Sequence, residues 1–136
     1  GTPSELGMLR FERDVLRENE QPDIIVIEFA VNDEGDETKG DCYESLVRKA
    51  LKLPWKPAVI LLFSVFANDW NLQERLMPVG LRYDLPMVSI KDAVVPQFKK
   101  QRKTKYKRRI SFSMICFIRA IWDIPLWQIV LAIFLN

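Results

Sequence analysis

The residues best suited to chemistry stand at the end of an apolar run. The segment EFAVND, residues 28–33, ends in Asn32 and Asp33. A rigidly held asparagine amide is an N–H donor that can stabilise the oxyanion formed when an ester carbonyl is attacked. Gly1, at a turn just before an expected helix, could add a backbone N–H, because glycine lets a backbone approach closely. The pattern predicts an oxyanion site made from Asn32 and Gly1.

The chain offers little support for other site chemistry. It contains no histidine, which excludes a histidine base or histidine metal ligand within it. Calcium binds oxygen clusters, but the acidic loop after Asn32 lacks the spacing of an EF-hand, so we interpret that loop as solvated. We expect no metal and no cofactor. The acidic loop residues are Asp33, Glu34, Asp36, Glu37 and Asp41.

Two polar residues stand inside apolar runs. Glu28 is interpreted as a structural acid with satisfied hydrogen bonds. Ser64 has no Gly-x-Ser-x-Gly elbow around it and is interpreted as a core residue. The two cysteines, Cys42 and Cys116, have no metal-ligand spacing.

The elements that must position Asn32 alternate along the chain. Short apolar runs predict three buried strands, at 24–31, 58–66 and 85–90. Helices are expected before, between and after these strands. This alternation predicts an α/β fold with a parallel sheet covered by helices on both faces.

Ligands of such sheets bind at the carboxyl ends of the strands. We therefore expect Asn32 and Asp33, residues 67–69, and Lys91 with Asp92 to lie along one edge.

Two helix starts carry the pattern of a capping box. In the first, Thr2 is expected to cap, Pro3 to occupy the first helical position, and Glu5 to complete the box. In the second, Asp41 is paired with Glu44.

The segments GTPSELGMLRFERDVL, PDIIVIEFAVND, PAVILLFSVF and LPMVSIKDA together resemble the middle of an SGNH (GDSL-type) hydrolase. The resemblance covers residues 1–98 and implies a three-layer, flavodoxin-like parallel sheet, truncated at its N-terminus. It also implies an oxyanion hole formed by Gly1 and by Asn32 in the family's Gly-x-Asn-Asp block. The family's glycine in that block is Ala30 here.

The resemblance also shows what the chain lacks. No Gly-Asp-Ser nucleophile motif precedes Gly1, and no Asp-x-x-His follows. We expect the chain to bind an oxyanion without forming an acyl-enzyme, and therefore to be inactive as it stands.

The C-terminal part differs sharply in charge. Residues 1–98 carry 11 basic and 17 acidic side chains, whereas residues 99–136 carry 9 basic and 1 acidic. A basic run at 99–109 precedes an aberrant apolar tail at 110–136. The tail is long enough for a membrane helix, but Arg119 and Asp123 would each cost about 2.5–3.5 kcal/mol there.

A frameshift gives a second explanation of the tail. If each true codon takes the last base of one codon and two of the next, Met114 and Ile115 must encode Asp. Phe117 and Ile118 then encode His or Tyr. With permissible choices elsewhere, the shifted frame reads Asp-Leu-Phe-His, which resembles the missing Asp-x-x-His block. We hypothesise a single frameshift after Phe98.

The sequence therefore predicts part of an SGNH-type ester hydrolase, whose substrate would be a small-molecule or carbohydrate acyl ester. The alternative is a non-catalytic, membrane-anchored or interaction protein, with a membrane partner only if residues 110–136 form a genuine helix. The basic run supplies only generic phosphate affinity, so we expect no nucleic-acid partner.

Overall fold

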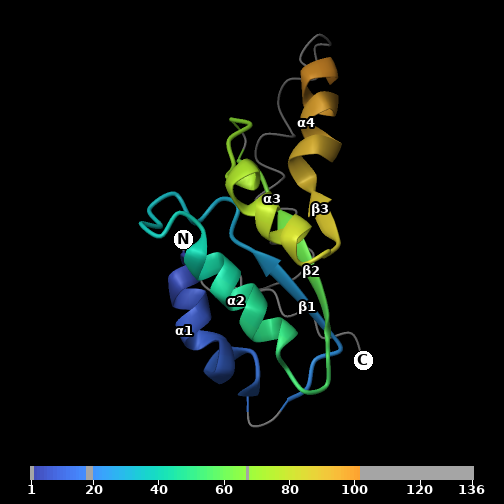
Figure 1. Cartoon of the computed structure of the whole chain (residues 1–136). Coiled ribbons are helices and arrows are strands. Elements are labelled where there is room, and N and C mark those ends of the chain that lie inside the picture. Colours follow the sequence, from blue (N-terminus) through green and yellow to red (C-terminus); the bar gives the residue numbers. More distant parts are fainter. Residues whose placement is uncertain (1, 18–19, 67, 102–136) are drawn as a thin grey trace.

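The computed structural model describes residues 2–17, 20–66 and 68–101. Helices and strands alternate along these residues (Figure 1). The elements are α1 (Ser4–Asp14), β1 (Ile24–Glu28), α2 (Asp41–Leu51), β2 (Ala58–Phe63), α3 (Gln73–Arg82), β3 (Met87–Ser89) and α4 (Ile90–Gln101). The expected α/β fold is confirmed.

The three strands form one parallel sheet in the order β1-β2-β3. Ile24 of β1 is paired with Ala58 of β2, and Leu61 of β2 is paired with Met87 of β3. Because consecutive strands are neighbours and such crossovers are right-handed, α2 and α3 lie on the same face. The carboxyl ends of all three strands therefore point to one edge.

The core lies between the sheet and the helices. In Figure 1, α1 and α2 run side by side over one face of the sheet. Every second residue of β2 is buried from Val59 onward, while the residues between them are only partly covered. The largest fully buried side chains include Phe11, Phe29, Tyr43, Leu46, Phe63 and Leu76.

Each strand is shorter than its apolar run. β1 ends at Glu28 rather than at Val31, because the chain turns there. The backbone N–H groups of Asn32 and Asp33 both donate to the Phe29 carbonyl oxygen, at 3.0 and 3.2 Å. The last residues of the apolar run therefore belong to a loop and not to the strand.

Both predicted capping boxes are wrong. Helix α1 begins at Ser4 with Pro3 in the N-cap position, and neither helix has a side-chain hydrogen bond from its N-cap residue. Helix α2 is preceded by Gly40, whose φ of 115° is the left-handed conformation that glycine adopts easily. Glu44 instead accepts hydrogen bonds from Arg82 and Tyr83.

Candidate functional site

Asn32 stands in the turn after β1, as the sequence predicts. Its side chain is half-buried. The backbone N–H is used in the turn, donating to the Phe29 carbonyl. The side-chain amide makes no hydrogen bond to any other residue that the structure describes. Among the described residues, its N–H group therefore has no acceptor.

The neighbouring Asp33 anchors this turn to α1. Its side chain is fully buried, and its Oδ1 accepts the backbone N–H of Ser4 at 2.7 Å. The carboxylate therefore occupies the positive end of α1, where a negative charge is favourable. The cap that the sequence assigned to Thr2 is supplied by Asp33, which follows Ser4 by 29 positions.

A second contact ties the same turn to α3. The guanidinium of Arg75 donates to the backbone carbonyl of Asp33 at 3.0 Å. Asp33 thus links the first turn of α1 to α3. Because Asn32 is covalently next to Asp33, these contacts restrict where its amide can lie.

Helix α1 comes unusually close to the end of β1. A Cβ atom at Gly7 would lie 2.6 Å from Cζ of Phe29, a distance at which one of the two must move. Glycine at this position allows the ring and the helix to pack together. The first turn of α1 is thereby brought beside the Asn32 turn.

Gly1, the other predicted oxyanion donor, lies outside the described residues. The structure places Ser4, three residues later, against Asp33. The role of Gly1 stays a prediction that follows from the resemblance.

Glu28 is a buried structural acid, as predicted. Its Oε1 accepts the backbone N–H of Ala30 at 2.9 Å and the Ser64 hydroxyl at 2.6 Å. Ser64 is buried too, which confirms its interpretation as a core residue. Burial raises the pKa of Glu28, and the two hydrogen bonds oppose this shift only in part. The carboxyl group joins the ends of β1 and β2.

The interpretation of the acidic loop as solvated is wrong for Asp33 and Asp36, which are both buried. The pKa of Asp33 is raised because its side chain is buried, and the hydrogen bond with Ser4 offsets this rise only in part. Burial also raises the pKa of Asp36, but hydrogen bonds from Thr38 and from the Gly40 N–H outweigh burial and hold it below its usual range. In the described residues, no group of acidic or cysteine side chains could hold a metal ion.

Several buried polar atoms near Asn32 have no hydrogen-bond partner among the residues that the structure describes. They are Ser4 Oγ, Asp33 Oδ2 and the Tyr43 hydroxyl. Burial and the nearby carboxylates of Glu28 and Asp33 raise the pKa of Tyr43. Unpaired buried groups of this kind are where ordered water commonly binds.

The strand ends meet along one edge, as expected. The backbone N–H of Leu72 donates to the Ala30 carbonyl at 2.7 Å, which joins the loop after β2 to the loop after β1. The ammonium of Lys91 donates to Oδ1 of Asn71 at 3.3 Å and so adds the end of β3. Of the other predicted edge residues, Asp92 accepts a hydrogen bond from Gln73, and Ala67 lies outside the described residues.

The sequence reasoning missed Ser4, Arg75 and Asn71. Their roles depend on partners that are distant along the chain, and Arg75 reaches Asp33 across 42 positions. An asparagine or arginine near the start of a helix gives no signal of such a contact.

None of the helices in the described part of the chain has the length and apolar character that a membrane span requires. Residues 110–136, on which the membrane alternative depends, lie outside the described residues. The alternative and the frameshift both stay predictions.

Among known proteins, solved structures of an esterase resemble this chain. No protein-family profile and no curated protein match the chain. A crystal structure of a two-domain esterase (CEX) active on acetylated mannans, co-crystallised with mannopentaose, is 38% identical with a TM-score of 0.68. A second crystal structure of a two-domain esterase (CEX) active on acetylated mannans is 37% identical with a TM-score of 0.64.

These matches cover 74% and 75% of this chain, but only 27% and 28% of the esterase chains. The chain therefore spans little more than a quarter of the length of the esterases that it matches. In fold and in sequence, the chain is similar to part of an esterase active on acetylated mannans.

Proposed function

We propose that this chain supplies the oxyanion-binding part of an SGNH-type ester hydrolase that removes acyl groups, including acetyl groups on carbohydrates. The observation that carries the proposal is the Asn32 amide. It lies at the carboxyl end of a parallel strand, makes no hydrogen bond to the described residues, and is held beside the buried Asp33. The identity of 38% to an esterase active on acetylated mannans supports the same activity.

The mechanism follows from the resemblance and from this geometry. A serine attacks the ester carbonyl, and a histidine oriented by an aspartate takes the serine proton. The carbonyl oxygen becomes negative, and it accepts hydrogen bonds from the Asn32 side chain and the Gly1 backbone. The chain contains no histidine, so the base comes from a segment outside this sequence or from a restored reading frame.

The side of β1 that no described strand covers supports a further strand in the active enzyme. Among the described residues, β1 pairs only with β2, although four of its five residues are buried. A strand whose backbone groups are unpaired along one side favours addition of another strand. A strand that carries the nucleophilic serine beside β1 would bring that serine to the edge where Asn32 lies.

The proposal is tested by assaying two proteins side by side. The chain of 136 residues should hydrolyse p-nitrophenyl acetate no faster than buffer does. A full-length version that also carries the serine and Asp-x-x-His segments should hydrolyse it and release acetate from acetylated mannan.

Two results would contradict the proposal. One is turnover by the chain alone that disappears in Asn32→Ala, because this would mean that the chain already contains its nucleophile. The other is a folded full-length version without esterase activity. Sequencing of the coding DNA tests the frameshift separately: a single-base repair after Phe98 should restore Asp-x-x-His.

A further inference from the structure

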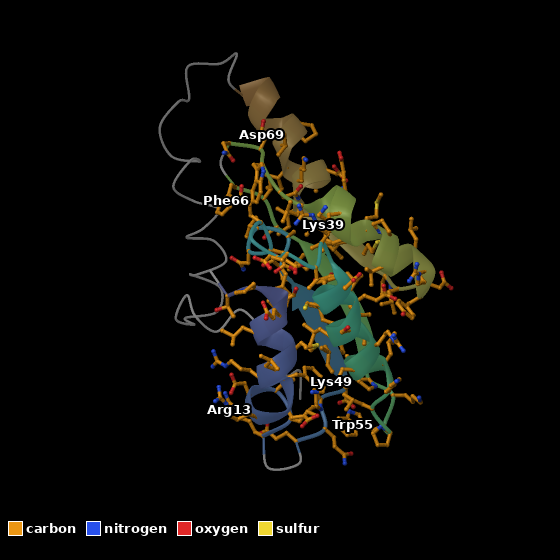
Figure 2. All side chains as sticks on the ribbon, turned by 60° about the vertical axis from the view of Figure 1, so that its left-hand side comes forward. Arg13, Lys39, Lys49, Trp55, Phe66 and Asp69 are labelled. Carbon is orange, nitrogen blue, oxygen red and sulfur yellow. The ribbon has the colours of Figure 1, made fainter. Side chains whose placement is uncertain are left out.

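An aromatic pair stands at the same edge of the sheet as Asn32. The rings of Phe66 and Trp70 are stacked, with centroids 5.6 Å apart and planes 23° apart. Phe66 is 38% exposed, and Trp70 is partly exposed. Figure 2 shows Phe66 well above Trp55, which lies near the lower end of the view. Exposing large aromatic rings to water costs free energy, so a stacked pair that stays partly exposed indicates a surface that binds a ligand.

The backbone holds this pair in place. The N–H of Phe66 donates to the Trp70 carbonyl, and the N–H of Asp69 donates to the Phe66 carbonyl, both at 3.0 Å. The N–H of Trp70 donates to the side chain of Asn68 at 3.1 Å. These bonds hold the backbone of Phe66 next to that of Trp70, so the stacked pair forms within the chain itself.

The loop that carries the pair is attached to the candidate oxyanion site. The Asn71 side chain donates to the Ser64 carbonyl at 2.9 Å, and the Ser64 hydroxyl donates to Glu28 at the end of β1. Leu72 donates to the carbonyl of Ala30, two residues before Asn32. The aromatic pair and the Asn32 amide therefore belong to one connected edge.

We propose that Phe66 and Trp70 form a platform on which one pyranose ring of the acetylated carbohydrate stacks while its ester is held at Asn32. A pyranose ring has a face of C–H groups bordered by hydroxyls. Its C–H face matches an aromatic surface, and its hydroxyls match a polar rim such as the exposed Asn68 side chain. This inference rests on the proposed function, since a carbohydrate ester supplies the ring.

The platform predicts binding that does not depend on turnover. Mannopentaose is the probe, and saturation-transfer NMR with a titration of the chain is the measurement. Phe66→Ala and Trp70→Leu should each weaken binding roughly tenfold, because each removes one aromatic surface from the stack. Phe66→Tyr should keep the affinity, because it keeps the ring.

Trp55→Phe is the matched control. Trp55 donates through Nε1 to the Pro22 carbonyl at 3.1 Å, before the start of β1. It therefore lies at the amino ends of the strands, away from Asn32. Its substitution should leave the affinity for mannopentaose unchanged.

Three results would overturn the platform. They are no binding of mannopentaose by the wild-type chain, equal binding by Phe66→Ala, and a loss in Trp55→Phe as large as that in Phe66→Ala. Far-ultraviolet circular dichroism checks that each variant is folded. A melting temperature lowered by Phe66→Ala without any loss of binding would mean that the pair packs against protein instead of sugar.

Activity separates this inference from the proposed function. If the full-length version releases acetate from acetylated mannan and Phe66→Ala leaves KM unchanged, the esterase proposal stands and the platform fails. If mannopentaose binds in a way that depends on Phe66 and no ester is cleaved, the platform stands and the esterase proposal fails.

Discussion

The loops after β1 and β2 lie at the same edge of the sheet but are held by different chemistry. Buried carboxylates hold the first, where Glu28, Asp33 and Asp36 accept backbone N–H groups. Neutral amides hold the second, through Asn68 and Asn71. Because carboxylates accept the hydrogen bonds that hold the first loop, these contacts should change with pH more than the Asn68 and Asn71 contacts of the second loop.

The two loops also differ in what they expose. The first buries its anchors, Glu28, Asp33 and Asp36, and the amide of Asn32 makes no hydrogen bond to the described residues. The second exposes an aromatic ring, Phe66. We propose that the first loop stabilises charge at the reacting ester and that the second holds the sugar. Substitution of Asn32 in the first loop should therefore lower kcat, whereas substitution of Phe66 or Trp70 in the second should weaken carbohydrate binding.

The largest loss of folding stability is expected for Asp33→Ala. Removing the carboxylate leaves the Ser4 N–H without its acceptor at the start of α1, and losing a helix cap costs about 0.5–2 kcal/mol. Urea denaturation measures this loss. Glu34→Ala is the control, because Glu34 is exposed, and its effect should stay within about 0.5 kcal/mol. Equal losses in both variants would mean that Asp33 does not anchor α1.

A smaller loss is expected for Asn71→Ala in the second loop. The substitution removes the hydrogen bond to the Ser64 carbonyl, which is worth about 0.5–1.5 kcal/mol. The loss should be the same at pH 5 and at pH 8, because no carboxylate takes part in this bond. A loss that grows or shrinks markedly between these pH values would remove the contrast between the two loops.

The smallest change is expected for Glu28→Gln, which keeps an acceptor for Ala30 and Ser64. The folded-state pKa of Glu28 is raised above its ordinary value of 4.5 because of burial. The folded chain therefore holds this proton more tightly than the unfolded chain, and stability falls as pH rises from about 4.5 through the folded pKa. Glutamine does not ionise, so the variant should gain stability relative to wild type as pH rises.

Urea denaturation at several pH values between 4 and 8 checks this sign. Near pH 4 both side chains are neutral, and the variant and the wild type should differ least. A variant that becomes relatively less stable as pH rises would show that the charged form of Glu28 is the favoured one. That outcome would contradict the burial argument.

Local sequence patterns predict much of the fold and one residue of the candidate site. Short β-branched runs predict the strands, since buried parallel strands require apolar residues on both faces. Asn32 was found because it follows such a run. The capping boxes failed because a helix start is satisfied by any acceptor within reach, and for α1 that acceptor is Asp33, a distant residue.

The remaining parts of the site could not be predicted from spacing. Asp33 and Asp36 lie in a polar stretch that is typical of solvated loops, and their burial follows from contacts with α1 and with the start of α2. Phe66 was expected at the end of a strand at 58–66, but β2 ends at Phe63, and beyond that end the Phe66 ring stacks on Trp70.

The central claim is that the Asn32 amide stabilises the oxyanion. It is tested most directly by kcat for acetyl ester hydrolysis in a full-length version that carries the serine and Asp-x-x-His segments. Asn32→Ala should lower kcat about 10²–10³-fold, or about 2.7–4 kcal/mol of transition-state stabilisation. Asp23→Ala, an exposed change just before the opposite end of β1, should leave kcat unchanged. If Asn32→Ala keeps the wild-type kcat while remaining folded, Asn32 is not the oxyanion donor.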